Sequence, residues 1–378
     1  MVQIWARDPG RVRRGLLRAL EVKCVLRETE VGTWQVTIDE TAPGAPKVQP
    51  GWGVVAVDDG AVVFSGPVES IGTSHQGQAR DTTLTGVTDM CALADRVVLP
   101  DPAQASDKQS TAAYWARKGP AETLIADLVN LQCGPANPFA SRRTAGLVAV
   151  VSQGRGAVSS VNARFSSVLV EVRTLATVGG LVVDVVQDGV SLVPAVRVPA
   201  DRSRSVRFLP NAGLADYDVK VTAPSTTVAL VGGQGEGTAR QIYFRAQTSE
   251  WGRRREVFQD RRDTADVDEL AKAADETLAE AGETASGTFA VTEGRYRRFG
   301  VDYQLGDTVT VGLPGGGEIV DGVRAVELAW TEFQDEGSST RDVELTVGPP
   351  GTEPVKTPAQ VAAIRRLLRQ VRGLETRR

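Results

Sequence analysis

The stretch VGGQGEG (Val231 to Gly237), followed by WGRRREVFQDRRDTADVDELAKAADETLAEAG (Trp251 to Gly282), decides how the second half of this chain folds. A loop punctuated by glycine comes first, a charged strand follows it, and an acidic helix closes the segment. PGGG, from Pro314 to Gly317, is a further turn signal of the same half and is typical of a hairpin. This order matches no catalytic motif.

The acidic helix is predicted over residues 264–282. Thr264 is the expected N-cap and Gly282 the expected C-cap, and the acidic first turns suit the positive end of the helix dipole. The charges from Asp263 to Glu283 are therefore interpreted as a solvated face. The opposite, packing face is predicted to consist of Val267, Leu270, Ala271, Ala274 and Leu278.

The first hundred residues predict antiparallel sheet. Trp34, Val36 and Ile38 alternate with polar residues, as in a strand with one buried face. Farther along, an Asp-Gly turn at 58–60 separates two apolar runs and predicts a hairpin. We expect a small barrel or sandwich over residues 1–103.

A mixed α and β domain is expected over residues 104–212, after a connection rich in Pro, Asp, Ser and Gln. Pro120 is predicted to open a helix that stops before Gly134. A second helix is predicted from the spacing of Phe165, Leu169, Val172 and Ala176. The valines at 168, 170 and 172 would suit a strand almost as well. The run LVVDVVQDGVSLVPAV after Gly180 predicts a hairpin.

Residues 213–350 predict a second β domain, which the acidic helix interrupts, and residues 351–378 a linker and a basic helix. Thr357 would cap this last helix and Pro358 would open it. Its apolar positions and the arginines beside them are the candidate oligomer or partner surface: Val361, Ile364, Leu368, Val371, Arg365, Arg369 and Arg372.

The C-terminal helix cannot stand alone, because ordering about fifteen residues costs more than burying four apolar side chains returns. Seven Lys and Arg residues against one Glu give the segment from Lys356 to Arg378 a local net charge of +6. Three roles of this helix remain open: docking on an acidic surface of a partner, a short trimeric bundle with its own copies, and a simple surface helix or frayed tail.

Composition and motifs argue against several function classes. The formal net charge is −4, so no basic field holds nucleic acid as a primary ligand, and any DNA contact is expected to be transient. No stretch of about 18 apolar residues predicts a membrane span, and the N-terminal residues do not form a signal peptide. Three scattered cysteines, without a metal-binding or redox spacing, are interpreted as small hydrophobes: Cys24, Cys91 and Cys133.

No catalytic, metal or cofactor site is predicted, and we expect no enzyme activity. His75 is the single histidine and falls in a polar turn between expected strands. Glu236 is the best carboxylate by context, but a Gly-rich turn explains its neighbours. GGQGEG lacks the Gly-Lys-Ser/Thr ending of a P-loop and leads into a strand. The arginines Arg253 to Arg255 are expected in a strand, where they pair with acidic neighbours.

Short strings in a fixed order along most of the chain carry a family resemblance. They are EVGTW (Glu30 to Trp34), SGPVESI (Ser65 to Ile71), LADR (Leu93 to Arg96), LPDPA (Leu99 to Ala103), GPAETL (Gly119 to Leu124), GRGAVSSVNARF (Gly154 to Phe165), GGLVVDVVQ (Gly179 to Gln187) and YQLGDTVTV (Tyr303 to Val311). Together with the opening stretch, they resemble the tail-tip hub or minor tail proteins of siphophages that infect actinobacteria. This family is related to the baseplate hub of contractile tails.

The resemblance implies an α+β, β-dominated fold with two small β-barrel tube domains and an intervening mixed domain. It implies a homotrimeric ring that continues or closes the tail tube at the virion tail tip, after assembly in the host cytoplasm. Its partners would be the distal tail protein and tail tube, the tape measure protein and receptor-binding proteins, and DNA would pass transiently. No cofactor is implied. The alternatives are a tail-associated peptidoglycan hydrolase and a carbohydrate-binding adhesion module.

Overall fold

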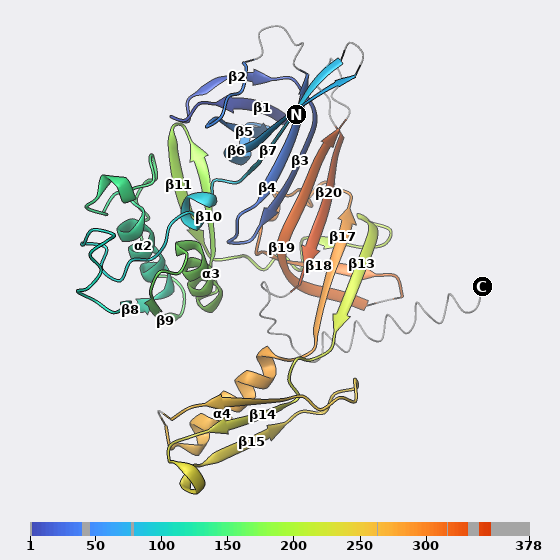
Figure 1. Ribbon diagram of the computed structural model, residues 1–378. Helices are drawn as coiled ribbons and strands as arrows, with labels where there is room; N and C mark the ends of the chain where they lie inside the picture. Colours follow the sequence, from blue (N-terminus) through green and yellow to red (C-terminus); the bar gives the residue numbers. More distant parts are fainter. Residues whose placement is uncertain are drawn as a thin grey trace. The chain divides into compact units, whose positions relative to one another are not determined.

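The computed structural model describes residues 2–39, 46–76, 79–262, 264–315, 317–331 and 340–348 (Figure 1). These residues form two compact units. The first comprises residues up to 200 together with 298–307 and 325–345, and the second comprises 201–297, 308–324 and 346–348. Strands dominate both units, which confirms the α+β, β-dominated class. The four-part division with boundaries at 103, 212 and 350 stays a prediction.

The first unit is built on a long antiparallel sheet. Its strands follow the order β20-β19-β3-β4-β7-β6-β5-β1-β2, and β19 belongs to this unit from Ala325 onward. This order is open, so closure into a barrel stays a prediction. The strands are β1 (Val2–Arg7), β2 (Arg13–Leu17), β3 (Ala19–Arg27), β4 (Thr33–Asp39), β5 (Gly53–Asp58), β6 (Ala61–Gln76), β7 (Ala79–Val87), β19 (Gly317–Thr331) and β20 (Thr340–Val347).

Local sequence patterns account for this sheet. In β4 the side chains of Trp34, Val36 and Ile38 are buried, which confirms the predicted alternation. Strands β5 and β6 form the predicted hairpin. Asp59 and Gly60 occupy its turn with φ values of +47° and +83°. Two successive positive φ values are those of the tight turn that matches the twist of paired strands.

Strand β6 changes partner at a crowded corner. Up to Pro67 it pairs with β5, and from Val68 onward with β7. A Cβ atom on Gly66 would lie 1.7 Å from the carbonyl oxygen of Val87, and one on Gly86 would lie 2.1 Å from that of Pro67. Trp34 covers the corner and donates from Nε1 to Val87 O at 2.8 Å. Only glycine permits this approach at positions 66 and 86, so Gly66 of SGPVESI and Trp34 of EVGTW meet at this corner.

A helical layer with its own core completes the first unit (Figure 1). Helix α2 ends before Gly134, as predicted, but Pro120 is its N-cap and not its first helical residue. Helix α3 confirms the helical alternative for its segment, although Phe165 lies ahead of it. The elements are α1 (Cys91–Ala94), β8 (Trp115–Pro120), α2 (Ala121–Gln132), the 3-10 turn η1 (Ala140–Arg142), β9 (Val158–Ala163), α3 (Val168–Gly179), and the predicted hairpin of β10 (Val182–Asp188) and β11 (Ser191–Arg197).

The second unit contains two antiparallel pairs and a separate small sheet. Strands β13 and β17 pair with each other. Strand β18 pairs with the first part of β19 around the predicted Pro314 turn, and β12 pairs with β18 in parallel. The elements are β12 (Arg207–Phe208), β13 (Leu214–Thr222), β14 (Val228–Gly232), the 3-10 turn η2 (Gly237–Ala239), β15 (Ile242–Ala246), β16 (Glu256–Asp260), α4 (Val267–Glu280), β17 (Thr284–Val291) and β18 (Thr308–Leu313).

Strands β14, β15 and β16 pack with α4 as a helix-backed sheet. Strand β14 lies in the middle, antiparallel to β15 and parallel to β16. Apolar side chains of the helix and of β14 form a core of six buried residues: Ala229, Val231, Leu270, Ala273, Ala274 and Leu278.

The bounds of α4 correct the predicted caps and packing face. Asp266, not Thr264, is the N-cap, and its side chain accepts from the N–H of Asp268. Thr264 instead accepts the N–H of Asp266, so the helix begins later than predicted. The C-cap is Ala281 rather than Gly282. Val267 is the first helical residue and is 47% exposed, while Ala273 takes a place in the core.

Candidate binding cavity and assembly surface

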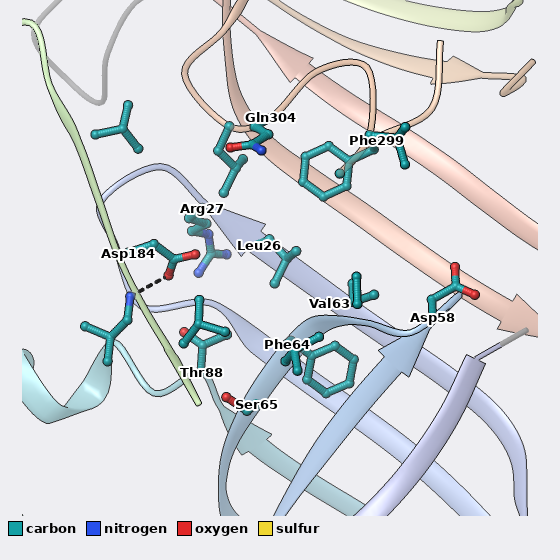
Figure 2. A pocket seen from close by; sticks show the side chains of 18 of the residues that line it. Leu26, Arg27, Asp58, Val63, Phe64, Ser65, Thr88, Asp184, Phe299 and Gln304 are labelled. Atoms are coloured by element: carbon teal, nitrogen blue, oxygen red, sulfur yellow. Dashed lines mark hydrogen bonds between the residues drawn. The ribbon is translucent and has the colours of Figure 1, made fainter. Parts of the chain in front are cut away.

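A cavity of about 280 Å³ lies within the first unit (Figure 2). Its walls come from β3, the β5–β6 hairpin, β10 and the segment 298–305. Leu26, Val63, Phe299 and Leu305 give it apolar walls. Segments far apart in the sequence thus meet around one space.

Three polar side chains point toward the interior of this cavity: Asp184, Arg27 and Gln304 (Figure 2). Asp184 is an exposed position of β10 and lines the cavity, and its carboxylate accepts the N–H of Val185 at 2.8 Å. Desolvation raises the pKa of Asp184, against the smaller lowering effects of that hydrogen bond and of Arg197. Its one hydrogen bond within the described part of the protein is to that backbone N–H, so the carboxylate can accept further hydrogen bonds from a ligand.

The segment 298–305 is held in place by the buried Asp58. Arg341 Nη1 lies 3.0 Å from the Asp58 carboxylate, and Arg298 Nη2 lies 3.4 Å from it. Within the segment, the rings of Phe299 and Tyr303 meet edge to face at 5.6 Å. The wall of the cavity is thus fixed by charge and by aromatic packing.

A buried polar network joins the β10–β11 hairpin to the sheet. Arg7 donates from both terminal nitrogens to Asp89, at 2.6 and 2.8 Å, and also to the side chain of Gln187. Ser65 donates to the same Asp89 carboxylate at 2.5 Å, and its oxygen accepts the N–H of Gln187 at 3.2 Å. Every charged member has a partner, which is the condition for a stable buried network.

A second buried ion pair fixes the start of α2. Glu122 is fully buried and accepts from the Arg155 guanidinium at 2.6 and 3.0 Å and from its backbone N–H at 2.8 Å. Arg155 also donates to the carbonyl oxygen of Val196 at 2.6 Å. The hydrogen bond from Arg155, more than the opposing desolvation, lowers the pKa of Glu122. GPAETL and GRGAVSSVNARF, two strings of the resemblance, supply this pair.

On the helix-backed sheet, an apolar row lies on the face away from α4. Leu230 is directly opposite Phe244 on one side and Phe258 on the other, and Ile242 lies beside them. Ile242, Phe244 and Phe258 are 49%, 51% and 53% exposed. We refer to these four side chains as the apolar row.

Two arginines lie over the apolar row. The Arg240 guanidinium is 5.3 Å from the centre of the Phe258 ring and pairs with Asp260. The Arg254 guanidinium is 5.8 Å from the Phe244 ring, and its Nε is 2.6 Å from Glu256. Asp260 also pairs with Arg262, whose Nε lies 3.1 Å from the second carboxylate oxygen, so two arginines share this one acidic partner.

The predicted site residues have mixed outcomes. The C-terminal candidates from Val361 to Arg372 lie outside the described residues, so their role stays a prediction. His75 lies within β6, opposite Arg80 of β7, so its placement in a turn was wrong because the strands extend to Gln76. Arg253 to Arg255 precede β16 instead of lying in a strand, although Arg254 pairs with an acidic neighbour as expected.

The other residues weighed for chemistry behave as ordinary structural residues. Glu236 precedes the turn η2 and the chain then enters β15, so no helix N-terminus follows the glycine loop. Cys24 and Cys133 are buried and Cys91 is partly buried. Burial raises the pKa of Cys91 and of Cys133 to about 12, so these thiols stay protonated.

Sequence reasoning missed the cavity. Asp184 is the one acidic residue in the apolar run LVVDVV, and this is the one local signal of a polar group at the cavity. Among the described residues, no group of three or more His, Cys, Asp and Glu side chains could hold a metal ion. No helix in the same part of the chain is long and apolar enough to cross a membrane.

Three solved structures share this fold at low sequence identity. The 43 kDa tail protein of prophage MuSo2 from Shewanella oneidensis has a TM-score of 0.57 and 13% identity, covering 94% of this chain and 100% of that chain. The tail protein from Neisseria meningitidis MC58 has a TM-score of 0.56 and 15% identity, with coverages of 93% and 98%. Prophage tail protein gp18 from Listeria monocytogenes EGD-e has a TM-score of 0.50 and 12% identity, with coverages of 97% and 99%.

The fold is therefore one that phage tail proteins adopt. A search of curated protein sequences finds no match. The family model of the Siphovirus ReqiPepy6 Gp37-like proteins matches residues 1–348, and the chain belongs to this family. The predicted resemblance to siphophage tail proteins is confirmed.

Proposed function

We propose that this chain is the baseplate hub, or minor tail protein, at the distal end of a siphophage tail, and that it acts without catalysis. The match of the family model over residues 1–348 carries the proposal. The fold shared with tail proteins of prophages supports it. Assembly would take place in the host cytoplasm.

In this proposal three copies form a ring that continues or closes the tail tube. The two β-rich regions, 1–103 and 213–350, would supply two barrel-like tube domains per copy, so that three copies present six similar positions to a sixfold tube. The ring would bind the distal tail protein, the tape measure protein and receptor-binding proteins. DNA would pass through it transiently.

The apolar row supports assembly through the helix-backed sheet. Exposed apolar patches bordered by polar groups mark interaction surfaces, and aromatic side chains with arginine are enriched at interface centres. A threefold ring requires a heterologous contact, in which the row of one copy meets a different surface of its neighbour.

A reconstruction of the tail tip of the assembled virion tests the position and symmetry. We expect this chain in a ring of three copies at the distal end of the tube. A subunit found elsewhere in the particle, or a single copy there, contradicts the proposal. A wall-degrading activity of the purified chain contradicts its non-catalytic part.

The double substitution Phe244→Ser and Phe258→Ser tests the assembly surface. Mass photometry should show trimers of the unaltered chain and monomers of the variant, because central aromatic side chains contribute about 2 kcal/mol or more each at interfaces. Val151→Ser is the matched control, since Val151 is 81% exposed and lies in the first unit. Trimers that persist in the double variant contradict the role of the row.

A further inference from the structure

We propose that the cavity of the first unit binds a single sugar ring, as the terminal unit of a glycan. This is a binding activity beyond the structural role of the chain and does not depend on it. The geometry that carries it is the meeting of Asp184, Arg27 and Gln304 inside a cavity with apolar walls (Figure 2).

Most of the charges that line the cavity are already paired. The partners lie in the described parts of the first unit: Asp58 with Arg298 and Arg341, Asp59 with Arg298, Glu30 with Arg173, and Arg197 with Asp307. In the same parts of the chain, Asp184 and Arg27 hydrogen-bond only to backbone groups. The Asp184 carboxylate accepts the N–H of Val185 at 2.8 Å, and Arg27 donates to the carbonyl oxygen of Val31 at 3.4 Å. Their charges thus remain available to a ligand.

The three polar side chains together select a neutral ligand with hydroxyl groups. A carboxylate only accepts hydrogen bonds, a guanidinium only donates them, and an amide does both. The positive charge of Arg27 would repel a cation, and the negative charge of Asp184 would repel an anion. A hydroxyl group can hydrogen-bond to either side chain. Asp184 accepts one hydrogen bond from the described residues, the Val185 N–H, so its carboxylate oxygens can accept further hydrogen bonds from ligand O–H groups.

The walls and the volume fit one ring. Leu26, Val63, Phe299 and Leu305 offer apolar surface to the C–H face of a sugar, which is the ordinary combination of apolar walls with few polar groups in ligand sites. Pockets for drug-sized ligands occupy about 300–1,000 Å³. A cavity of about 280 Å³ lies just below that range and suits a single ring rather than an enclosed oligosaccharide.

Saturation-transfer difference NMR on the full chain tests the proposal. The probes are glucose, galactose, mannose, rhamnose and N-acetylglucosamine, with ethylammonium and inorganic phosphate as ligands of the two excluded charge classes. We expect at least one sugar to bind with a Kd in the millimolar range. Asp184→Asn and Arg27→Gln should each weaken it about tenfold, the effect of one hydrogen bond to a charged group.

Asp188→Asn is the matched control, because Asp188 ends the same strand, is exposed and lies outside the cavity. Gln304→Ala is a second variant, in case Asp184→Asn fails to fold. Gln304→Ala keeps the backbone N–H of residue 304, which donates to the Asp307 carboxylate. Absence of binding by all five sugars, binding unchanged in every cavity variant, or competition by ethylammonium or phosphate overturns the proposal. Trimer formation should be the same in all variants, so failure here leaves the hub function standing.

Discussion

The ion pair of Arg7 and Asp89 in the first unit leaves 5% and 4% of the two side chains exposed, whereas the pair of Arg245 and Asp275 in the helix-backed sheet leaves 49% and 52% exposed. The first unit buries charge between elements that are far apart in the sequence. The helix-backed sheet has a core of apolar side chains alone, and its Arg245–Asp275 pair stays in solvent.

This difference separates two ways of using polar groups. A buried pair contributes less to net stability than its Coulomb energy suggests, but removing one partner leaves a charge in a poor solvent. An exposed pair is screened and can be lost with little effect. We therefore expect the first unit to depend on a few specific charges and the helix-backed sheet on its apolar core.

The largest effect is expected from Arg7→Met. This substitution leaves the Asp89 carboxylate buried without its bidentate partner, so the free energy of unfolding of the first unit should fall by about 3–5 kcal/mol. Urea unfolding followed by hydrogen exchange of the first-unit peptides measures it. Arg7→Met combined with Asp89→Leu should recover part of the loss. Arg14→Met, in an exposed pair with Asp8, is the control, and an equal loss there would break the comparison.

A smaller, local effect is expected from Leu270→Ala. Leu270 is fully buried in the core between α4 and β14, and removing such a side chain costs about 2–5 kcal/mol. Hydrogen exchange should accelerate in α4 and in β14, β15 and β16, and not in peptides of the first unit. Val267→Ala, at an exposed position of the same helix, should change little. Faster exchange throughout the chain would show that the two regions do not differ as described.

Local signals explain which parts of the fold could be predicted. The turn at Asp59 and Gly60 and the helix after Pro120 depend on neighbouring residues, so the sequence pattern suffices. The cap of α4 was misplaced because Thr264 and Asp266 are both good N-cap residues two positions apart. In the structure the carbonyl oxygen of Thr264 accepts the N–H of Gln234, whereas that of Asp266 accepts the N–H of Leu270 and begins the helix.

The candidate sites depend on contacts that no local pattern records. Arg7 lies 82 residues from Asp89 and 180 residues from Gln187, so the buried network has no signature in either neighbourhood. The cavity has no local signature either, because its walls come from segments as far apart in the sequence as Leu26 and Arg341. The apolar row could have been noticed, since Ile242 and Phe244 alternate with Tyr243 and Arg245, but strand alternation alone does not say which face a helix covers.

Glu122→Gln sharpens the comparison through pH. The hydrogen bond from Arg155, opposed by desolvation, holds the pKa of Glu122 below its ordinary value of 4.5. A folded-state pKa that is lowered contributes stability in full above about pH 4.5, and this contribution is lost as the pH falls through the folded-state pKa. The variant should lose about 1–3 kcal/mol at pH 7, and the difference from the unaltered chain should shrink in acid.

Urea unfolding at several pH values between 7 and acid measures this difference. Glu171→Gln in α3 is a control on the surface of the same helical layer, since Glu171 is only partly buried and hydrogen-bonds to Ser166. A difference between Glu122→Gln and the unaltered chain that stays constant with pH would contradict the assignment of the stabilisation to the ionised pair.

The smallest effect is expected for an exposed pair within α4. Lys272 and Glu276 are one helical turn apart, their charged atoms lie 3.8 Å apart, and the side chains are 77% and 58% exposed. Lysine four residues before glutamate is the less favourable order for the helix dipole. The coupling energy from Lys272→Gln, Glu276→Gln and the double variant should be about 0.5 kcal/mol or less and should vanish in high salt. A coupling as large as that of Arg7 with Asp89 would mean that the helix-backed sheet also depends on specific charges, and the comparison would fail.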